Sequence, residues 1–135
     1  MKSVVVDTNV FMSALIGSPA CNTIVDAAID TKIKLITSKA LIDEFVDTLH
    51  KPKFVNLIPP EDSRVLISFL KNHAVLIKPR HHVRICRDAK DNFLLELALS
   101  SDCDCVVSGD NDLLALSPFR NIPIITPAEF VTTIK

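Results

Sequence analysis

The stretch Lys2-Ser3-Val4-Val5-Val6-Asp7 near the amino terminus indicates an α/β fold. Three consecutive valines without a polar break are typical of a central parallel strand that is buried on both faces. Asp7 follows at once, so a carboxylate is expected at the carboxyl end of this strand. In open parallel sheets that end is where ligands bind.

Short apolar runs alternate with helical patterns along the rest of the chain. Further strands are expected at residues 34–37, 74–77, 103–107 and 122–125. Helices are expected at residues 9–16, 21–29, 39–51, 60–70, 90–99 and 112–116, with a last helix beginning at the capping-box sequence of residues 126–129. Residues 52–59 and 78–87 are expected to be irregular. The alternation predicts a three-layer α/β/α sandwich with a central parallel sheet, formed by one domain over residues 1–135.

The composition excludes several classes of protein. Fifteen Lys and Arg against sixteen Asp and Glu give a formal charge of −1, so a nucleic-acid function must rest on local charge and on metal ions. Asp7 and Asn9 interrupt the apolar amino-terminal run before it reaches the length of a signal peptide or membrane span, which favours a cytoplasmic protein that does not interact with membranes. The four cysteines lack metal-site spacing and are expected to be reduced core thiols, with Cys103 and Cys105 on one face of a strand.

Four acidic residues lie at the ends of predicted strands, beside the buried face of a predicted helix or in the first turn of another. Asp7 and Asp110 follow apolar strands, Glu44 lies beside the buried stripe of a helix, and Asp91 lies in the first turn of another. A single acid there can be a helix cap or a solvated charge, but four carboxylates close together repel one another and favour a hard cation. Oxygen ligands suit Mg²⁺ or Mn²⁺, and the chain lacks the glycine-rich motifs of nucleotide cofactors.

Four blocks of sequence resemble the PIN-domain ribonuclease superfamily. Val4-Val5-Val6-Asp7-Thr8-Asn9-Val10 resembles the opening strand and first acid of PIN domains, and the order and approximate spacing of the other blocks cover almost the whole chain. Those other blocks are Ser38–Phe45, Asp88–Leu94 and Val106–Leu114.

The resemblance implies a divalent-metal-dependent endoribonuclease that leaves a 5′-phosphate and a 3′-hydroxyl. The acids implied as catalytic residues and metal ligands are Asp7, Glu44, Asp91 and Asp110. Supporting residues implied by it are Thr8, Asn9 and Ser108, with Asp112 as a candidate fifth acid and Asp88 as an alternative or additional third acid. The short architecture is similar to toxin components of prokaryotic toxin–antitoxin pairs, which implies a small antitoxin partner and a homodimer.

Basic residues gather between Lys78 and Lys90, around the adjacent His81 and His82. With RNA as substrate, this segment is the best candidate for phosphate contacts, although an ordinary solvated loop has the same composition. The residues predicted to bind RNA are Arg80, Arg84, Arg87 and Lys90. Adjacent histidines rarely converge on one ion, so a metal pair at His81-His82 is not expected.

Other functions fit the sequence less well. A phosphatase of the haloacid-dehalogenase class needs a second Asp two residues after the first, where this chain has Asn9, and a receiver-type phosphoacceptor needs neither Glu44 nor the block around Asp110. A catalytically silent PIN-like module that binds RNA or protein is the main alternative from another class, and the complete acid set argues against it. A stand-alone RNA-processing nuclease is the alternative to a toxin.

Overall fold

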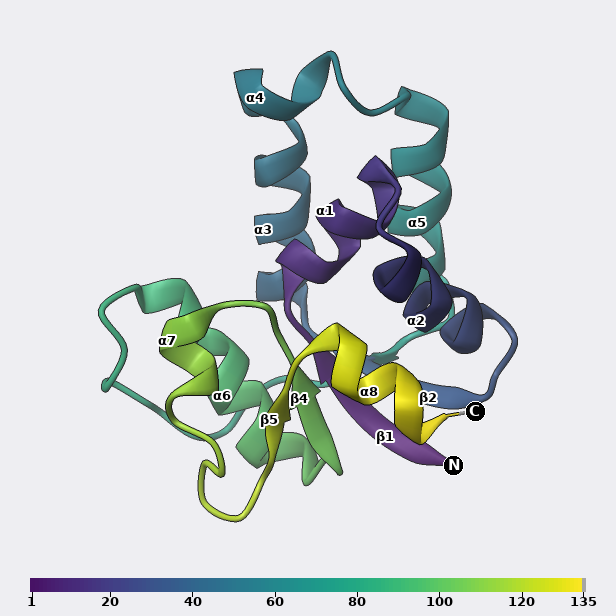
Figure 1. Cartoon of the computed structure of the whole chain (residues 1–135). Helices are drawn as coiled ribbons and strands as arrows, with labels where there is room; N and C mark the ends of the chain where they lie inside the picture. The colour runs from purple at the N-terminus through teal and green to yellow at the C-terminus, as the bar shows by residue number, and fades with distance from the viewer. Residues whose placement is uncertain (135) are drawn as a thin grey trace.

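The computed structural model describes residues 1–134, which form a parallel sheet between two layers of helices (Figure 1). Five strands lie in the order β3-β2-β1-β4-β5, and every pairing between neighbours is parallel. Their bounds are β1 (Lys2–Val6), β2 (Ile33–Thr37), β3 (Val75–Leu76), β4 (Cys105–Val107) and β5 (Ile124–Ile125). The predicted fold class is therefore confirmed, and β1 is the central strand.

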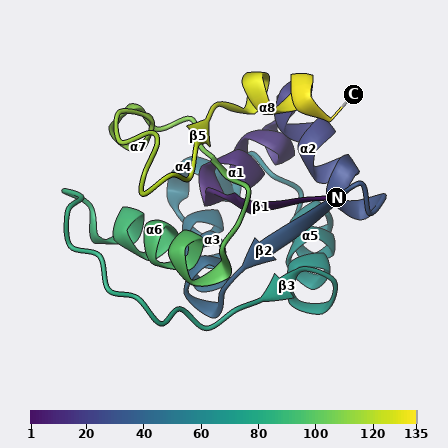
Figure 2. The same cartoon turned by 90° about the horizontal axis from the view of Figure 1, so that it is seen from below.

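The helices connect the strands and cover both faces of the sheet. They are α1 (Thr8–Ile16), α2 (Pro19–Ile29), α3 (Lys39–Leu49), α4 (Pro52–Val55), α5 (Pro60–Asn72), α6 (Ala89–Ser101), α7 (Asn111–Leu114) and α8 (Pro127–Thr133). Figure 2 shows α2 and α8 on one side of the sheet and α6 on the other. None of the helices within residues 1–134 is long and apolar enough to cross a membrane alone; α1 and α2 pass such a test only as a pair, which is bent by 109°.

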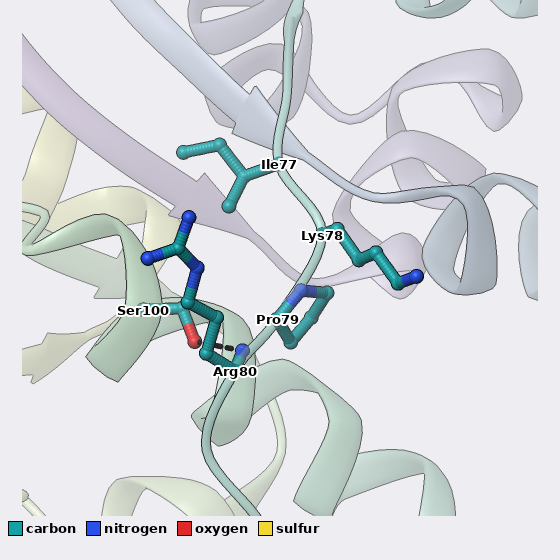
Figure 3. A pocket seen from close by; sticks show the side chains of 5 residues that line it. All are labelled: Ile77, Lys78, Pro79, Arg80 and Ser100. Carbon is teal, nitrogen blue, oxygen red and sulfur yellow. Dashed lines mark hydrogen bonds between the residues drawn. The ribbon is translucent and has the colours of Figure 1, made fainter.

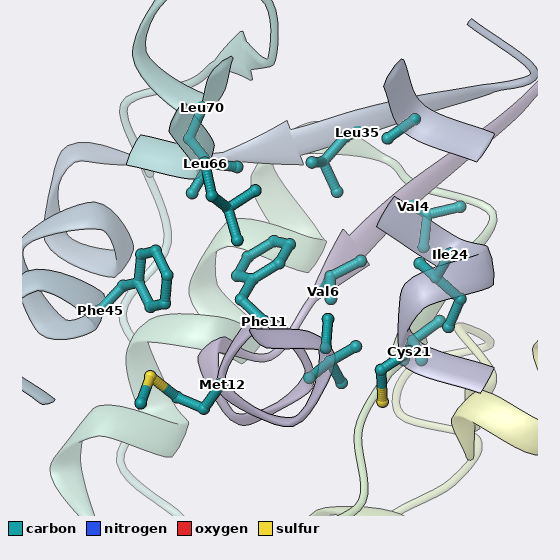
Figure 4. Packing of buried hydrophobic residues seen from close by; sticks show 14 of the residues in the cluster. Val4, Val6, Phe11, Met12, Cys21, Ile24, Leu35, Phe45, Leu66 and Leu70 are labelled. Carbon is teal, nitrogen blue, oxygen red and sulfur yellow. The ribbon is translucent and has the colours of Figure 1, made fainter. Parts of the chain in front are cut away.

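The central strand alternates its valines between two hydrophobic clusters because successive strand residues point to opposite faces. Val4 and Val6 pack with Phe11 of α1 and Phe45 of α3 in the larger cluster, which Figure 4 shows from close by. Val5 points to the other face and packs with the buried leucines of α6. With none of these valines more than 2% exposed, β1 is held on both faces, which fixes the position of the residue that follows it.

Some predicted details were wrong. Cys103 precedes β4 instead of beginning it, and it packs in the cluster on the α6 side, whereas Cys105 packs in the cluster on the opposite side. The cause is Asp102, whose left-handed backbone (φ 53°) ends α6 and delays the start of the strand. The loop predicted after Pro52 contains the short helix α4, and α2 begins at Pro19, capped by Ser18. All four cysteines are free thiols; Cys21, Cys103 and Cys105 are buried as predicted, whereas Cys86 is only partly buried.

Candidate active site

The two neighbouring strands β1 and β4 bring Asp7 and Asp110 to the same edge of the sheet. Val6 pairs with Val107, and the backbone N–H of Asp7 donates to the Val107 carbonyl at 2.9 Å. Each acid then caps the helix that follows it: Asp7 Oδ1 accepts from the N–H of Asn9 at 3.3 Å, and Asp110 Oδ1 accepts from the N–H of Asp112 at 2.9 Å. The caps hold both carboxylates at the helix starts.

Ser108 connects these two acids. Its hydroxyl donates to Asp7 Oδ2 at 2.8 Å, and its Oγ accepts from the backbone N–H of Asp110 at 3.0 Å. The serine is completely buried, so these bonds have no competition from water. Ser108 therefore fixes the orientation of the Asp7 carboxylate.

Glu44 approaches the same edge of the sheet from α3. Thr8, the first residue of α1, donates a hydrogen bond from its hydroxyl to Glu44 Oε1 at 3.1 Å. Burial raises the pKa of Glu44, the hydrogen bond from Thr8 lowers it, and the charge of Asp7 raises it further. The electrostatic influence of Asp7 on Glu44 shows that these two acids belong to one cluster.

Asp91 has a strongly raised pKa. Partial burial is the largest cause, followed by the negative charges of Asp110, Asp7, Asp88 and Glu44, and together they raise its pKa from 3.8 to about 6. Asp7 is only 7% exposed, and burial likewise raises its pKa, opposed by the hydrogen bonds from Ser108 and Asn9. Perturbed acids that act on one another in this way are typical of functional sites.

The positions of Asp88 and Asp91 distinguish the two candidates for the third acid. The Asp88 carboxylate is exposed and caps α6 by accepting from the N–H of Lys90 at 3.0 Å. Asp91 lies in the first turn of α6, and the charges of Asp110, Asp7 and Glu44 all raise its pKa. Asp91 is thus the more buried of the two, whereas Asp88 caps α6 and its charge raises the pKa of both Asp91 and Glu44.

Asp112 and the residues predicted to bind RNA are exposed to solvent. Arg87 Nη2 contacts Asp112 Oδ1 at 3.3 Å in an ion pair whose two side chains are exposed. Arg80, Arg84 and Lys90 are exposed as well, so they are accessible to a polyanion. An exposed ion pair contributes little to stability, so Arg87 can exchange Asp112 for a phosphate at small cost.

The donor set suits a hard divalent cation. Asp7, Glu44, Asp91 and Asp110 offer only carboxylate oxygens, and their mutual repulsion would be relieved by a positive ion. Within residues 1–134, however, no three His, Cys, Asp or Glu side chains approach closely enough in this arrangement to hold one ion. The acids fit the cation by chemistry and by shared location, and closing around it requires side-chain movement.

Sequence reasoning missed three residues beside this cluster. Asn92, Glu96 and Ser100 lie on one stripe of α6, and each accepts hydrogen bonds from the backbone of residues 80–86. Their spacing of four residues is visible in the sequence. The segment that they bind is irregular, however, so its sequence has no periodic pattern that predicts where it lies.

Comparison with known proteins identifies the family. A sequence model of the PIN domain matches residues 3–112. The chain belongs to the PIN domain family. PIN domains are typically nucleases that use divalent metal ions.

Among relatives of this PIN domain, the uncharacterized protein MJ1680 of Methanocaldococcus jannaschii is 31% identical, over 95% of this chain and 88% of its own length. Two crystal structures share the fold. PAE2754 from Pyrobaculum aerophilum superposes with a TM-score of 0.61 at 15% identity, covering 99% of this chain and 89% of that one. FitAcB from Neisseria gonorrhoeae superposes with a TM-score of 0.55 at 16% identity, covering 93% of this chain and 98% of that one.

Proposed function

We propose that this PIN domain is a divalent-metal-dependent endoribonuclease whose ions are held by Asp7, Glu44, Asp91 and Asp110. The observation that carries the proposal is the placement of these acids at one edge of the sheet, where Ser108 donates to Asp7 and Thr8 donates to Glu44. The charges of the other acids, together with burial, raise the pKa of Asp91 to about 6. Asp7 is buried and the other three acids are partly buried, and the repulsion among such carboxylates opposes folding unless a ligand compensates it, so the cluster favours a functional cation.

Each side chain has a distinct part in this proposal. Asp7 is fixed by the Ser108 hydroxyl and the Asn9 N–H, and Glu44 is oriented by Thr8, so two of the acids are positioned before any cation arrives. A bound divalent ion would supply activation of water and neutralisation of the leaving oxygen of the phosphodiester.

The Cys86 thiol lies near the cluster and is a poor nucleophile. Burial, then the negative charges of Asp91 and Asp110, raise the pKa of the Cys86 thiol above its ordinary value of 9.0. A protonated thiol is a poor nucleophile, so covalent catalysis by Cys86 is disfavoured at neutral pH. Hydrolysis by water is the reaction that these residues support.

RNA would be held by phosphate contacts from Arg80, Arg84, Arg87 and Lys90, which are exposed along one segment of the chain. These contacts position the strand without selecting its sequence. The formal charge of −1 for the whole chain means that attraction of RNA depends on this local concentration of positive charge.

The test is incubation of purified protein with a mixture of end-labelled single-stranded RNAs and Mn²⁺, with and without chelator. Cleavage should require the ion and leave 5′-phosphate ends. Asp7→Asn should abolish cleavage, whereas Asp62→Asn, on α5 and outside the cluster, should leave it unchanged. Cleavage that persists in Asp7→Asn, or in the presence of chelator, would contradict the proposal.

We further propose a biological role from the resemblance of the chain to toxin components of toxin–antitoxin pairs. In this role the protein acts in the cytoplasm as a homodimer and is inhibited by a small antitoxin. Expression of the wild type alone should arrest growth of a bacterial host, and Asp7→Asn should relieve the arrest. Normal growth with active, soluble protein present would favour a stand-alone RNA-processing nuclease instead.

A further inference from the structure

The irregular segment between β3 and α6 is held along the helix by a row of hydrogen bonds. We call residues 78–87 the strap; Figure 2 shows the chain running from β3 beside α6 before it turns back into the first turn of that helix. Ser100 Oγ accepts from the Arg80 N–H at 2.8 Å, and Glu96 Oε2 accepts from the Val83 N–H at 2.9 Å. Asn92 Oδ1 completes the row.

Asn92 accepts from two successive backbone N–H groups of the strap, those of Ile85 at 3.2 Å and Cys86 at 2.9 Å. Val83 is the apolar anchor, buried against the cluster on the α6 face of the sheet. The strap therefore has a defined backbone path, although it forms no helix or strand.

This path leaves the basic side chains of the strap in solvent. Lys78, Arg80, Arg84 and Arg87 are all exposed, and residues 78–87 contain no acid. Because α6 uses the backbone donors of the strap, the charged side chains are the groups that remain for a ligand. A row of exposed cations with no acid among them attracts a polyanion.

Two hollows flank the beginning of the strap. One, of about 530 Å³, is lined by Ile77, Lys78, Pro79, Arg80 and Ser100 (Figure 3). Figure 3 shows Ile77 and Arg80 on one side of the chain and Lys78 on the other. The second hollow, of about 580 Å³, is lined by Ser38, Lys39, Ala40, Leu76, Ile77, Lys78 and Pro79. Each hollow combines aliphatic side chains, which can contact the face of a base, with a cationic side chain, which can contact a phosphate.

The two hollows lie partly on the helices that also carry acids of the cluster. Ala40, in the second hollow, lies one helical turn before Glu44 on α3. The Ile77 N–H donates to the Thr37 carbonyl at 3.0 Å, so the strap leaves the sheet at the strand-end edge where Asp7 lies. Ser100, in the first hollow, is nine residues beyond Asp91 on α6, a distance of about 14 Å along the helix.

We propose that the strap and its two hollows form a binding track for single-stranded RNA that begins at the acid cluster, with Lys78 and Arg80 binding phosphates and Ile77 and Pro79 contacting a base. Asn92, Glu96 and Ser100 are positioning residues that fix the strap. The proposal rests on the proposed nuclease function for its choice of RNA as the polymer. Single strands are favoured because the base of a duplex is stacked and unavailable to an apolar wall.

The binding experiment uses a fluorescent single-stranded 12-nucleotide RNA with the full chain in chelator, so that no cleavage occurs. Affinity is measured between 50 and 200 mM salt for the wild type, for Lys78→Ala/Arg80→Ala, and for the matched control Lys53→Ala/Arg64→Ala. The control removes the same charges from α4 and α5, away from the strap. Loss of two phosphate contacts should reduce the slope of log affinity against log salt concentration by about 1.4. Between 50 and 200 mM salt, the affinity of the variant should therefore fall by a factor about sevenfold smaller than that of the wild type.

A second experiment separates the track from the catalytic site. With Mn²⁺, Lys78→Ala/Arg80→Ala should raise KM for the 12-nucleotide RNA by about tenfold, with a much smaller change in kcat. The control Lys53→Ala/Arg64→Ala should change neither constant. Glu96→Ala should also raise KM for the longer RNA, whereas Glu96→Gln, which keeps an acceptor for the Val83 N–H, should restore it.

The outcomes distinguish the two proposals. RNA binding with the expected salt dependence but no cleavage by the wild type would support the track and overturn the nuclease. Metal-dependent cleavage with unchanged KM and salt dependence in Lys78→Ala/Arg80→Ala would overturn the track alone. Tighter binding of a duplex or of an acidic peptide to the same residues would also overturn it.

Discussion

Replacement of Asp91 by Asn should stabilise the metal-free protein above pH 6. Asp91 is ionised at that pH, and partial burial and the charges of Asp110 and Asp7 make its ionisation unfavourable in the folded state. Asn has nearly the same shape and no charge. The folded protein therefore loses a repulsive interaction that the unfolded chain does not have.

The sign and size of this effect follow from the two pKa values of Asp91. The pKa rises from 3.8 to about 6 on folding, so the native state binds the proton more tightly, and wild-type stability falls as the pH rises through this interval. The full shift corresponds to at most about 3 kcal/mol. Asp91 is only partly buried, and its position in the first turn of α6 favours negative charge, so about 1 kcal/mol is expected.

Urea unfolding in chelator from pH 4 to pH 8 measures this difference. The stability of Asp91→Asn should match that of the wild type near pH 4 and exceed it at pH 8. Asp62→Asn is the matched control, because Asp62 lies in the first turn of α5, outside the cluster. It loses only a favourable interaction with the helix dipole and should be slightly destabilised. If Asp91→Asn is destabilised to the same extent at pH 8, the acids do not repel one another and the electrostatic argument is wrong.

Three further perturbations test the cluster. Millimolar Mn²⁺ should raise the melting temperature of the wild type, because a cation that binds only the folded state stabilises it by mass action, and an unchanged melting temperature would contradict the metal site. Asp7→Asn should fold with a metal-free stability within about 1 kcal/mol of the wild type and cleave RNA slower by orders of magnitude; an unfolded variant on circular dichroism would assign Asp7 a structural role. Ser108→Ala should cost about 1–3 kcal/mol in urea unfolding, because the buried hydroxyl bonds both to Asp7 and to the Asp110 N–H, and an unchanged stability would refute that linkage.

The elements with clear sequence periodicity were predictable. The strand β1 is indicated by its consecutive valines, and the start of α8 is indicated by the capping box of Thr126 and Glu129. Both patterns involve only residues that are close in sequence, and the structure confirms both elements. The face on which Cys103 lies was predicted wrongly, because it depends on the left-handed conformation of Asp102. Asp adopts that conformation infrequently, and no local pattern indicates it.

Prediction of the candidate site had a similar limit. Strand-end acids could be located because the ends of neighbouring parallel strands share an edge, which places Asp7 near Asp110 without further information. The strap could not be located, since its path depends on contacts with Glu96 and Ser100 that are 13 and 20 residues away in sequence. Sequence alone therefore identified its charges but not the helix that fixes them.

The same local interactions explain how the fold tolerates concentrated negative charge. Asp7 and Asp110 each use a carboxylate oxygen to cap a helix, so backbone N–H groups at the starts of α1 and α7 offset part of their repulsion without metal. Glu44 has one hydrogen bond from Thr8, while Asp91 is left with a pKa of about 6. The hydrogen bonds that offset negative charge are thus more numerous at Asp7 than at Glu44 and Asp91. A cation would gain most from Asp91, whose charge is least compensated, and would find Asp7 already in place.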